Sequence, residues 1–346
     1  MRKLLLLIIL LTYIAVPVSA MDFSAPTAPD GAQEYMPENT DSFAQGLWYV
    51  IKSAVAKLQP SIAEAAGVCL SLFAVVLLVS VMQSFSEGTR KISQLVGTLG
   101  IGILLFYPTN SLITLGTATI KELSDYGKLL LPVLTGALAA QGGATSSAAL
   151  YTGTAIFDAV LSSVISKLIV PMLYVYLCLC VANSAAGETL LKKIRDFVKW
   201  AMTWCLKIVL YVFTGYISIT GVVSGTADAA TIKAAKLAIS GAVPVVGSIL
   251  SDASETILVS AGVLKSAVGV YGLLAILAVW IGPFFQIGIQ YLLLKITSAV
   301  CGVIGTKDSA ALIEDFSGAM GMLLAMTGTV CLLLLISTVC FMKGVS

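Results

Sequence analysis

Long charge-free stretches recur through the chain from residue 65 onward, and they determine the solvent in which it folds. The clearest occupy residues 65–86, 92–120, 129–157, 168–187, 208–227, 266–294 and 316–342. A helix needs about 20 mostly apolar residues to cross the hydrocarbon core of a bilayer. These stretches meet that length, and ionisable residues gather between them. The pattern predicts an all-α, polytopic bundle of transmembrane helices.

The composition excludes several classes of function. Hydrophobic residues make up 58% of the chain and charged residues 11%, against about 45–50% and 25% in soluble domains. The net charge of +2 and the lack of a basic run give no nucleic-acid-binding surface. Histidine is absent, which removes histidine-dependent catalysis and metal ligation. No metalloprotease, phosphate-loop or dinucleotide motif occurs. We therefore expect no enzyme activity, cofactor or metal.

The N-terminus is typical of an exported segment. Residues 1–20 combine a basic start, an apolar core and small residues before Met21, as a signal peptide does; the alternative is an uncleaved anchor helix. Residues 21–64 then form an extracytoplasmic part. It begins with an acidic, proline-containing tail, predicted to be mobile. It continues with an amphipathic helix over residues 43–57, lying on the outer membrane surface. Residues 65–346 form the polytopic membrane domain.

Charge placement predicts the orientation. With the tail outside, residues 87–91 lie inside and residues 121–128 form an outer loop. Residues 188–199 carry four basic side chains and belong in the cytoplasm by the positive-inside rule. A tight inner turn at Gly282-Pro283, an outer acidic loop at residues 307–315 and a cytoplasmic C-terminus follow. This count gives about seven spans, with nine as the upper number.

Two short apolar segments differ from plain spans. Residues 130–143 and 238–250 are each rich in small residues, and each contains one proline. Paired, interrupted segments of this kind indicate a transport pathway, so both are candidate re-entrant segments. The alternative is a pair of short packed helices whose small residues allow close contact. The candidate positions in them are Pro132, Gly136, Gly241, Pro244 and Gly247.

Polar residues also mark one of the last spans. Gln286 and Gln290 are four residues apart, so both amides lie on one helical face, and Lys295 follows deeper in the apolar stretch. An ionisable residue inside a membrane usually faces protein or water. This face either lines a polar cavity or bonds a neighbouring helix.

Residues 188–199 have the pattern of an amphipathic basic helix beside a span. The basic side chains are Lys192, Lys193, Arg195 and Lys199. One interpretation is a helix held on anionic headgroups, at about 1 kcal/mol per basic residue. The other is a docking site for a cytoplasmic partner, for which these four residues are the candidates.

Two stretches carry a resemblance to a known family. Residues 236–258 read KLAISGAVPVVGSILSDASETIL, and residues 211–222 read YVFTGYISITGV. Both are similar to segments of the stage III sporulation protein AE family. The signal peptide, the acidic tail and the number of spans fit the same family, so the resemblance extends over essentially the whole chain.

The resemblance implies a protein of endospore-forming bacteria, located in the mother-cell membrane around the engulfed forespore. It also implies partners: the sibling stage III sporulation proteins AA to AH and, across the intermembrane space, forespore protein Q. Together these resemble a secretion or feeding channel. The family has no catalytic motif to carry over.

Three functions remain open at this point. The first is an export-gate or permease-like subunit of that channel complex. The second is a non-conducting membrane scaffold that recruits ring-forming partners. The third is a stand-alone secondary transporter. The cargo, the stoichiometry and conduction itself are not encoded in any motif.

Overall fold

The computed structural model describes residues 26–37, 42–85, 90–140, 144–219, 267–304 and 307–344. Within these ranges the chain is helical and contains no strand. Among the described residues, six helices are long and apolar enough to cross a membrane. The predicted all-α polytopic bundle is therefore confirmed.

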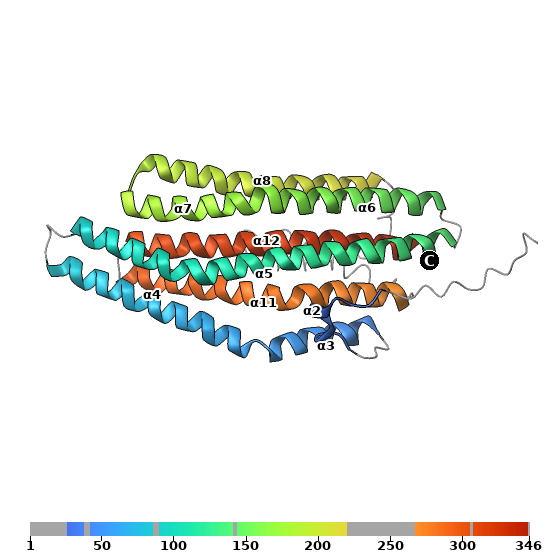
Figure 1. The fold of residues 1–346 in the computed structure, drawn as a ribbon, viewed down its shortest axis with the longest axis horizontal. Helices are drawn as coiled ribbons and strands as arrows, with labels where there is room; N and C mark the ends of the chain where they lie inside the picture. The colour runs from blue at the N-terminus through green and yellow to red at the C-terminus, as the bar shows by residue number, and fades with distance from the viewer. Residues whose placement is uncertain are drawn as a thin grey trace, which may run out of the picture.

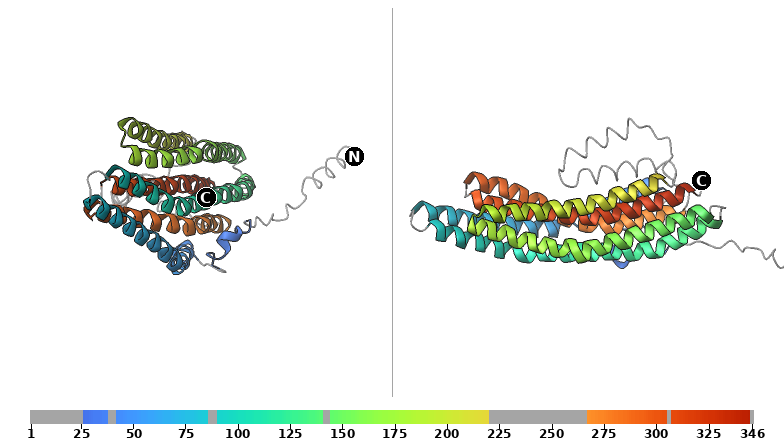
Figure 2. Two further views of the ribbon diagram at one scale, coloured as in Figure 1. Left: turned by 60° about the vertical axis from the view of Figure 1, so that its left-hand side comes forward. Right: turned by 90° about the horizontal axis from the view of Figure 1, so that it is seen from above.

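The helices form an elongated bundle of three layers (Figures 1 and 2). The elements are α2 (Asp30–Gln33), α3 (Phe43–Ala56), α4 (Gln59–Phe85), α5 (Arg90–Ala140), α6 (Ala144–Val164), the π-helical turn η2 (Ile165–Ile169), α7 (Val170–Ala186), α8 (Thr189–Ile219), α11 (Ala267–Ile304) and α12 (Lys307–Gly344). In Figure 1, α6, α7 and α8 form the upper layer, α5 and α12 the middle one, and α4 and α11 the lower one.

Both ends of the bundle can be defined by the helices that meet there. We call the end where α4, α7 and α11 finish and α5, α8 and α12 begin the hairpin end (left in Figure 1). The opposite end, where α5 and α12 finish, is the tail end. At the hairpin end Gly187 closes α7 with φ of 68°, a left-handed conformation that glycine adopts without steric cost.

Helix α12 forms the core. It packs against α5, α6, α7, α8 and α11, and within residues 319–342 only Ile336 is not fully buried. A helix that is apolar all round is stable only when other helices surround it. Its few hydroxyls are satisfied locally, because Thr329, Ser337 and Thr338 each donate to the carbonyl four residues earlier, at 2.6–2.8 Å.

Two expected breaks in the chain are absent. Residues 121–128, predicted to be an outer loop, are helical within the 51 residues of α5. The tight turn predicted at Gly282-Pro283 is also wrong, because α11 continues through Pro283. A proline inside a helix removes one backbone hydrogen bond, and an apolar helix with close neighbours tolerates that loss.

The first candidate re-entrant segment is a packed helix end. Residues 130–140 are the last turns of α5 and contain no turn back. Leu130, Leu131 and Leu134 are buried, and a Cβ added at Gly272 of α11 would lie 2.8 Å from Leu130. Close contact with small residues is the alternative that the sequence left open, and the structure corrects the re-entrant interpretation here. The second segment, residues 238–250, lies outside the described residues.

Part of the acidic tail is packed rather than mobile, which corrects a second expectation. Ala28 and Ala32 are buried, and the Ala28 N–H donates to the Tyr271 hydroxyl of α11 at 3.2 Å. Helix α3 begins at an N-cap, where the Ser42 hydroxyl accepts from the Gln45 N–H at 3.3 Å. Its Trp48 is 68% exposed. The signal-peptide prediction falls on residues outside the described ones.

The topology also differs from the prediction. The Ser184 hydroxyl, near the end of α7, donates to the Asp308 carbonyl at 3.2 Å. The region after α7 and the start of α12, predicted on opposite faces, therefore share the hairpin end. The tail and the end of α12, also predicted on opposite faces, lie together. Met342 of α12 packs against Gly269 of α11, and Tyr271, two residues after Gly269, accepts the hydrogen bond from Ala28 of the tail.

Candidate functional site

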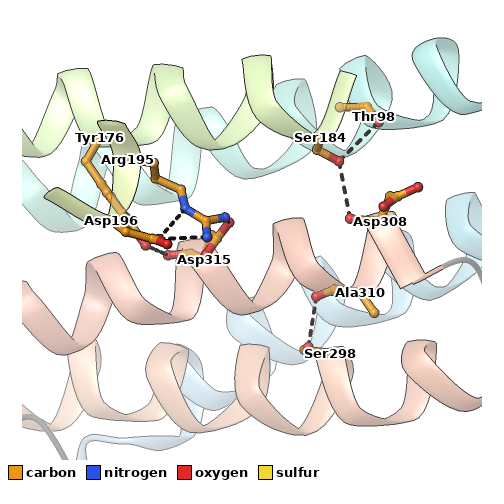
Figure 3. A network of polar contacts seen from close by, with 9 residues as sticks. All are labelled: Thr98, Tyr176, Ser184, Arg195, Asp196, Ser298, Asp308, Ala310 and Asp315. Atoms are coloured by element: carbon orange, nitrogen blue, oxygen red, sulfur yellow. Dashed lines mark hydrogen bonds and ion pairs between the residues drawn. The ribbon is translucent and has the colours of Figure 1, made fainter. Parts of the chain in front are cut away.

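A polar network crosses the bundle near its hairpin end (Figure 3). Arg195 of α8 donates through Nη1 to Oδ2 of Asp315 on α12, at 2.5 Å. Its Nε and Nη2 donate to Oδ1 of Asp196, at 3.0 and 2.8 Å. The Arg195 and Asp315 side chains are only 11% and 14% exposed. The pair is therefore largely desolvated, and each charge depends on the other.

Further contacts extend the network to other helices. The Tyr176 hydroxyl of α7 donates to the Asp315 carbonyl at 3.3 Å. Thr98 of α5 and Ser184 share a hydrogen bond of 3.4 Å. Ser298 of α11 donates to the Ala310 carbonyl at 2.9 Å. Five helices are thus joined at one end of the bundle, so the network holds the relative positions of α5, α7, α8, α11 and α12.

The four candidate docking residues do not share one surface. Lys192 and Lys193 are exposed on α8. Arg195 turns inward to Asp315, and Lys199 is half-buried, with its Nζ close to Gly318 of α12. Of the four, Lys192 and Lys193 are therefore the two available to a partner or to lipid headgroups.

A polar pocket brings together the two glutamines that the sequence analysis singled out. Gln286 and Gln290 line a cavity of about 160 Å³ between α4, α5 and α11. Gln290 is 5% exposed, and its Nε2 donates to no described group. The other polar lining residues are Ser61, Glu64 and Ser111.

The remaining candidate residues do not join this pocket. Lys295 forms an ion pair with Glu314 of α12 on the exposed surface. Pro132 and Gly136 lie near the end of α5 and are not among the lining residues. Gly241, Pro244 and Gly247 lie outside the described residues. The structure therefore unites Gln286 and Gln290 and separates them from Lys295, Pro132 and Gly136.

A buried carboxylate was not among the predicted site residues. Asp158 of α6 is 4% exposed and accepts a hydrogen bond of 2.6 Å from the Ser124 hydroxyl of α5. Its other oxygen, Oδ1, and the Thr154 hydroxyl one turn earlier have no partner among the described groups. The sequence signal was a single aspartate after a long apolar stretch, a pattern that marks a residue facing protein or water.

The cysteine and acidic side chains are scattered in the part of the chain that the structure describes. No group of three or more cysteine, aspartate or glutamate side chains is placed to hold a metal ion there. All seven cysteines are free thiols, and Cys180, Cys301, Cys331 and Cys340 are buried. Such cysteines act as small hydrophobic residues.

Comparisons with known proteins point to one family. The profile of the family described as stage III sporulation protein AE matches residues 37–344. The stage III sporulation protein AE of Bacillus subtilis (strain 168) is 22% identical over 241 residues, which cover 69% of this chain and 60% of that protein. The match thus spans less than two thirds of that relative. No solved structure matches. The family is one of sporulation membrane proteins and is not a known enzyme family.

Proposed function

Because the chain belongs to the stage III sporulation protein AE family, we propose that it is a multi-pass membrane subunit of the channel complex between mother cell and forespore. In this proposal it lies in the mother-cell membrane around the forespore, with its hairpin end in the mother-cell cytoplasm. Its tail end faces the intermembrane space. The sibling stage III sporulation proteins AA to AH and forespore protein Q are its partners.

The geometry favours a packed platform over a pore through a single chain. The observation that supports the platform is the position of α12, which occupies the middle of the bundle and is buried by five other helices. Interiors packed with side chains leave no continuous path for water or cargo. In this role the polar network at the hairpin end (Figure 3) holds the platform in one arrangement. Lys192 and Lys193, on the same helix as Arg195, are exposed.

An export-gate role is the second candidate, and the glutamine pocket is the observation that favours it. An unpartnered amide at Gln290, beside Gln286 and Glu64, is expensive in an apolar bundle unless it meets water or cargo. In that case the path for water or cargo runs along the side of the bundle between α4, α5 and α11. Neighbouring subunits form the rest of its wall.

Two matched double variants separate these roles in sporulating cells. The first is Gln286→Leu with Gln290→Leu in the pocket, and the second is Lys192→Glu with Lys193→Glu on the exposed face of α8. For each variant, protein accumulation, co-purification of sibling stage III proteins and spore yield are measured.

The platform role predicts that the pocket variant accumulates, captures its partners and sporulates as the unchanged protein does. It predicts that the charge-reversed variant loses partner capture while its topology stays intact. Loss of sporulation in the pocket variant, with accumulation and capture intact, would support the export gate instead. Unchanged capture by the charge-reversed variant would leave that helix as a membrane anchor.

A further inference from the structure

The bundle is much longer than a bilayer is thick. The 51 residues of α5 extend about 76 Å, and the 38 residues of α11 and of α12 about 57 Å each. The hydrocarbon core is only about 30 Å thick. We propose that the bilayer surrounds the hairpin-side part of the bundle only, and that the tail-side part stands in water as a rigid helical projection. This inference does not depend on the proposed role in the complex.

The exposed face of α5 shows how the surface of the bundle changes along its axis. Ile103 and Tyr107 are 74% and 77% exposed, and Thr114, Lys121 and Asp125 are exposed after them. These positions are four or seven residues apart and therefore lie on one face of the continuous helix. Lys121 and Asp125 lie about 27 and 33 Å along the helix axis from Ile103. The exposed side chains of this face therefore change from large and apolar to charged over that length.

Other helices of the hairpin side expose the same kind of surface. Large apolar side chains point outward from three of them, at Leu70 and Leu78 of α4, Leu292 of α11, and Trp204 and Ile208 of α8. The exposed Lys295–Glu314 pair lies closer to the hairpin end than Leu292, at the edge of this apolar zone. An apolar surface that recurs around a bundle is the one that lipid acyl chains cover. The tail-side helices also expose Leu129, Tyr151, Ile156 and Val160, and water-facing surfaces tolerate such side chains.

The packed tail supplies independent support. The segment with Asp30 and Glu34 lies along the tail-side flank of the bundle, where Ala28 bonds Tyr271 and the Tyr35 ring lies close to Gly282. Gly31 contacts the Glu122 carboxylate of α5. A segment with two carboxylates on this flank keeps acyl chains away from it, because charged groups are costly in hydrocarbon.

Single cysteines on the exposed face of α5 test the position of the bilayer. In a cysteine-free chain, Ile103→Cys and Tyr107→Cys report the hairpin side, and Lys121→Cys and Asp125→Cys the tail side. Each variant is placed in lipid nanodiscs, whose two faces are both open to solvent, and is treated with a charged maleimide. The denatured variants are labelled as controls for thiol reactivity.

We expect labelling at positions 121 and 125 and loss of labelling at positions 103 and 107, with all four labelled after denaturation. Transfer to detergent without lipid changes none of the tail-side results. Protection of 121 and 125 in nanodiscs would overturn the proposal, because the charged face would then lie in the bilayer. Labelling at 103 and 107 would overturn it as well.

Discussion

Arg195 donates a 2.5 Å hydrogen bond to the carboxylate of Asp315, a residue 120 positions further along the chain. The two side chains join α8 to α12 and are almost fully shielded from solvent. This contact determines which chain segments share an end of the bundle. Because Arg195 points inward, at most three of the four basic side chains between residues 188 and 199 are left for an external surface.

Breaking this pair is expected to destabilise the bundle strongly. Arg195→Ala leaves Asp315 as an unpaired buried charge, at a cost of about 3–5 kcal/mol. Thermal unfolding in detergent measures the loss. The control is Lys192→Ala, an exposed change on the same helix that should stay within about 0.5 kcal/mol. Equal stability of the two variants would show that Arg195 and Asp315 do not depend on each other.

A close approach between α6 and α8 gives a second prediction. A Cβ added at Gly153 would overlap the Tyr216 ring, so Gly153→Ala forces a stiff side chain to move, at about 1–3 kcal/mol. The control is Gly215→Ala, next to Tyr216 in sequence, where a Cβ meets nothing within 4 Å. The melting temperature should fall for the first variant only; a fall of equal size in both would contradict the contact.

The Ser124–Asp158 contact gives a third prediction. Ser124→Ala removes the hydroxyl that donates to a buried carboxylate, and we expect a loss of about 1–3 kcal/mol. Adding Asp158→Leu to this variant should recover much of that loss, because the unsatisfied carboxylate is then gone. Unfolding of both variants in denaturant measures the difference. Asp125→Asn, which alters an exposed pair with Lys128, should cost no more than about 1 kcal/mol.

The tail contact between Glu34 and Lys57 predicts a pH dependence. The two side chains form an exposed ion pair of 2.5 Å. The hydrogen bond and charge of Lys57 hold the pKa of Glu34 below its ordinary value, and Glu34 raises the pKa of Lys57. The contribution of Glu34 is therefore present above its unfolded pKa, about 4.3, and is lost as pH falls through the lower folded pKa. That of Lys57 is lost as pH rises through its raised folded pKa.

Hydrogen exchange of the amides of residues 30–36 measures this contribution. Glu34→Gln should slightly lower the protection factors of these amides at neutral pH, and acid should lower them in the unchanged chain, each measured relative to the intrinsic exchange rate at the same pH. Salt should reduce the effect of the substitution, because the pair is exposed and screened. If Glu34→Gln does not change the protection of these amides at low salt, the ion pair has no role in tail packing.

The sequence predicted those features that depend on local pattern. Apolar length alone predicted membrane-crossing helices, and the spacing of Gln286 and Gln290 predicted that they share a face. The helix of residues 188–199 was likewise evident from its periodicity. Each of these depends on contacts or solvents that the same stretch of chain specifies.

Features set by distant partners could not be predicted. A charged run at residues 121–128 and the dipeptide Gly282-Pro283 are ordinary signals of a chain break, and packing against neighbours keeps both helical. The continuous α11 replaced two predicted crossings with one, and this reversed the direction of α12. The inward turn of Arg195 was also hidden, because it depends on a carboxylate far along the chain.

Sidedness at Lys193 and Lys307 tests the arrangement of the bundle most directly. Each position receives a single cysteine in a cysteine-free chain, and sealed membrane vesicles are treated with a membrane-impermeant thiol reagent before and after permeabilisation. Because Arg195 contacts Asp315, we predict that both positions are labelled from the same face. Labelling from opposite faces would contradict the bundle described here and restore an outer location for the start of α12.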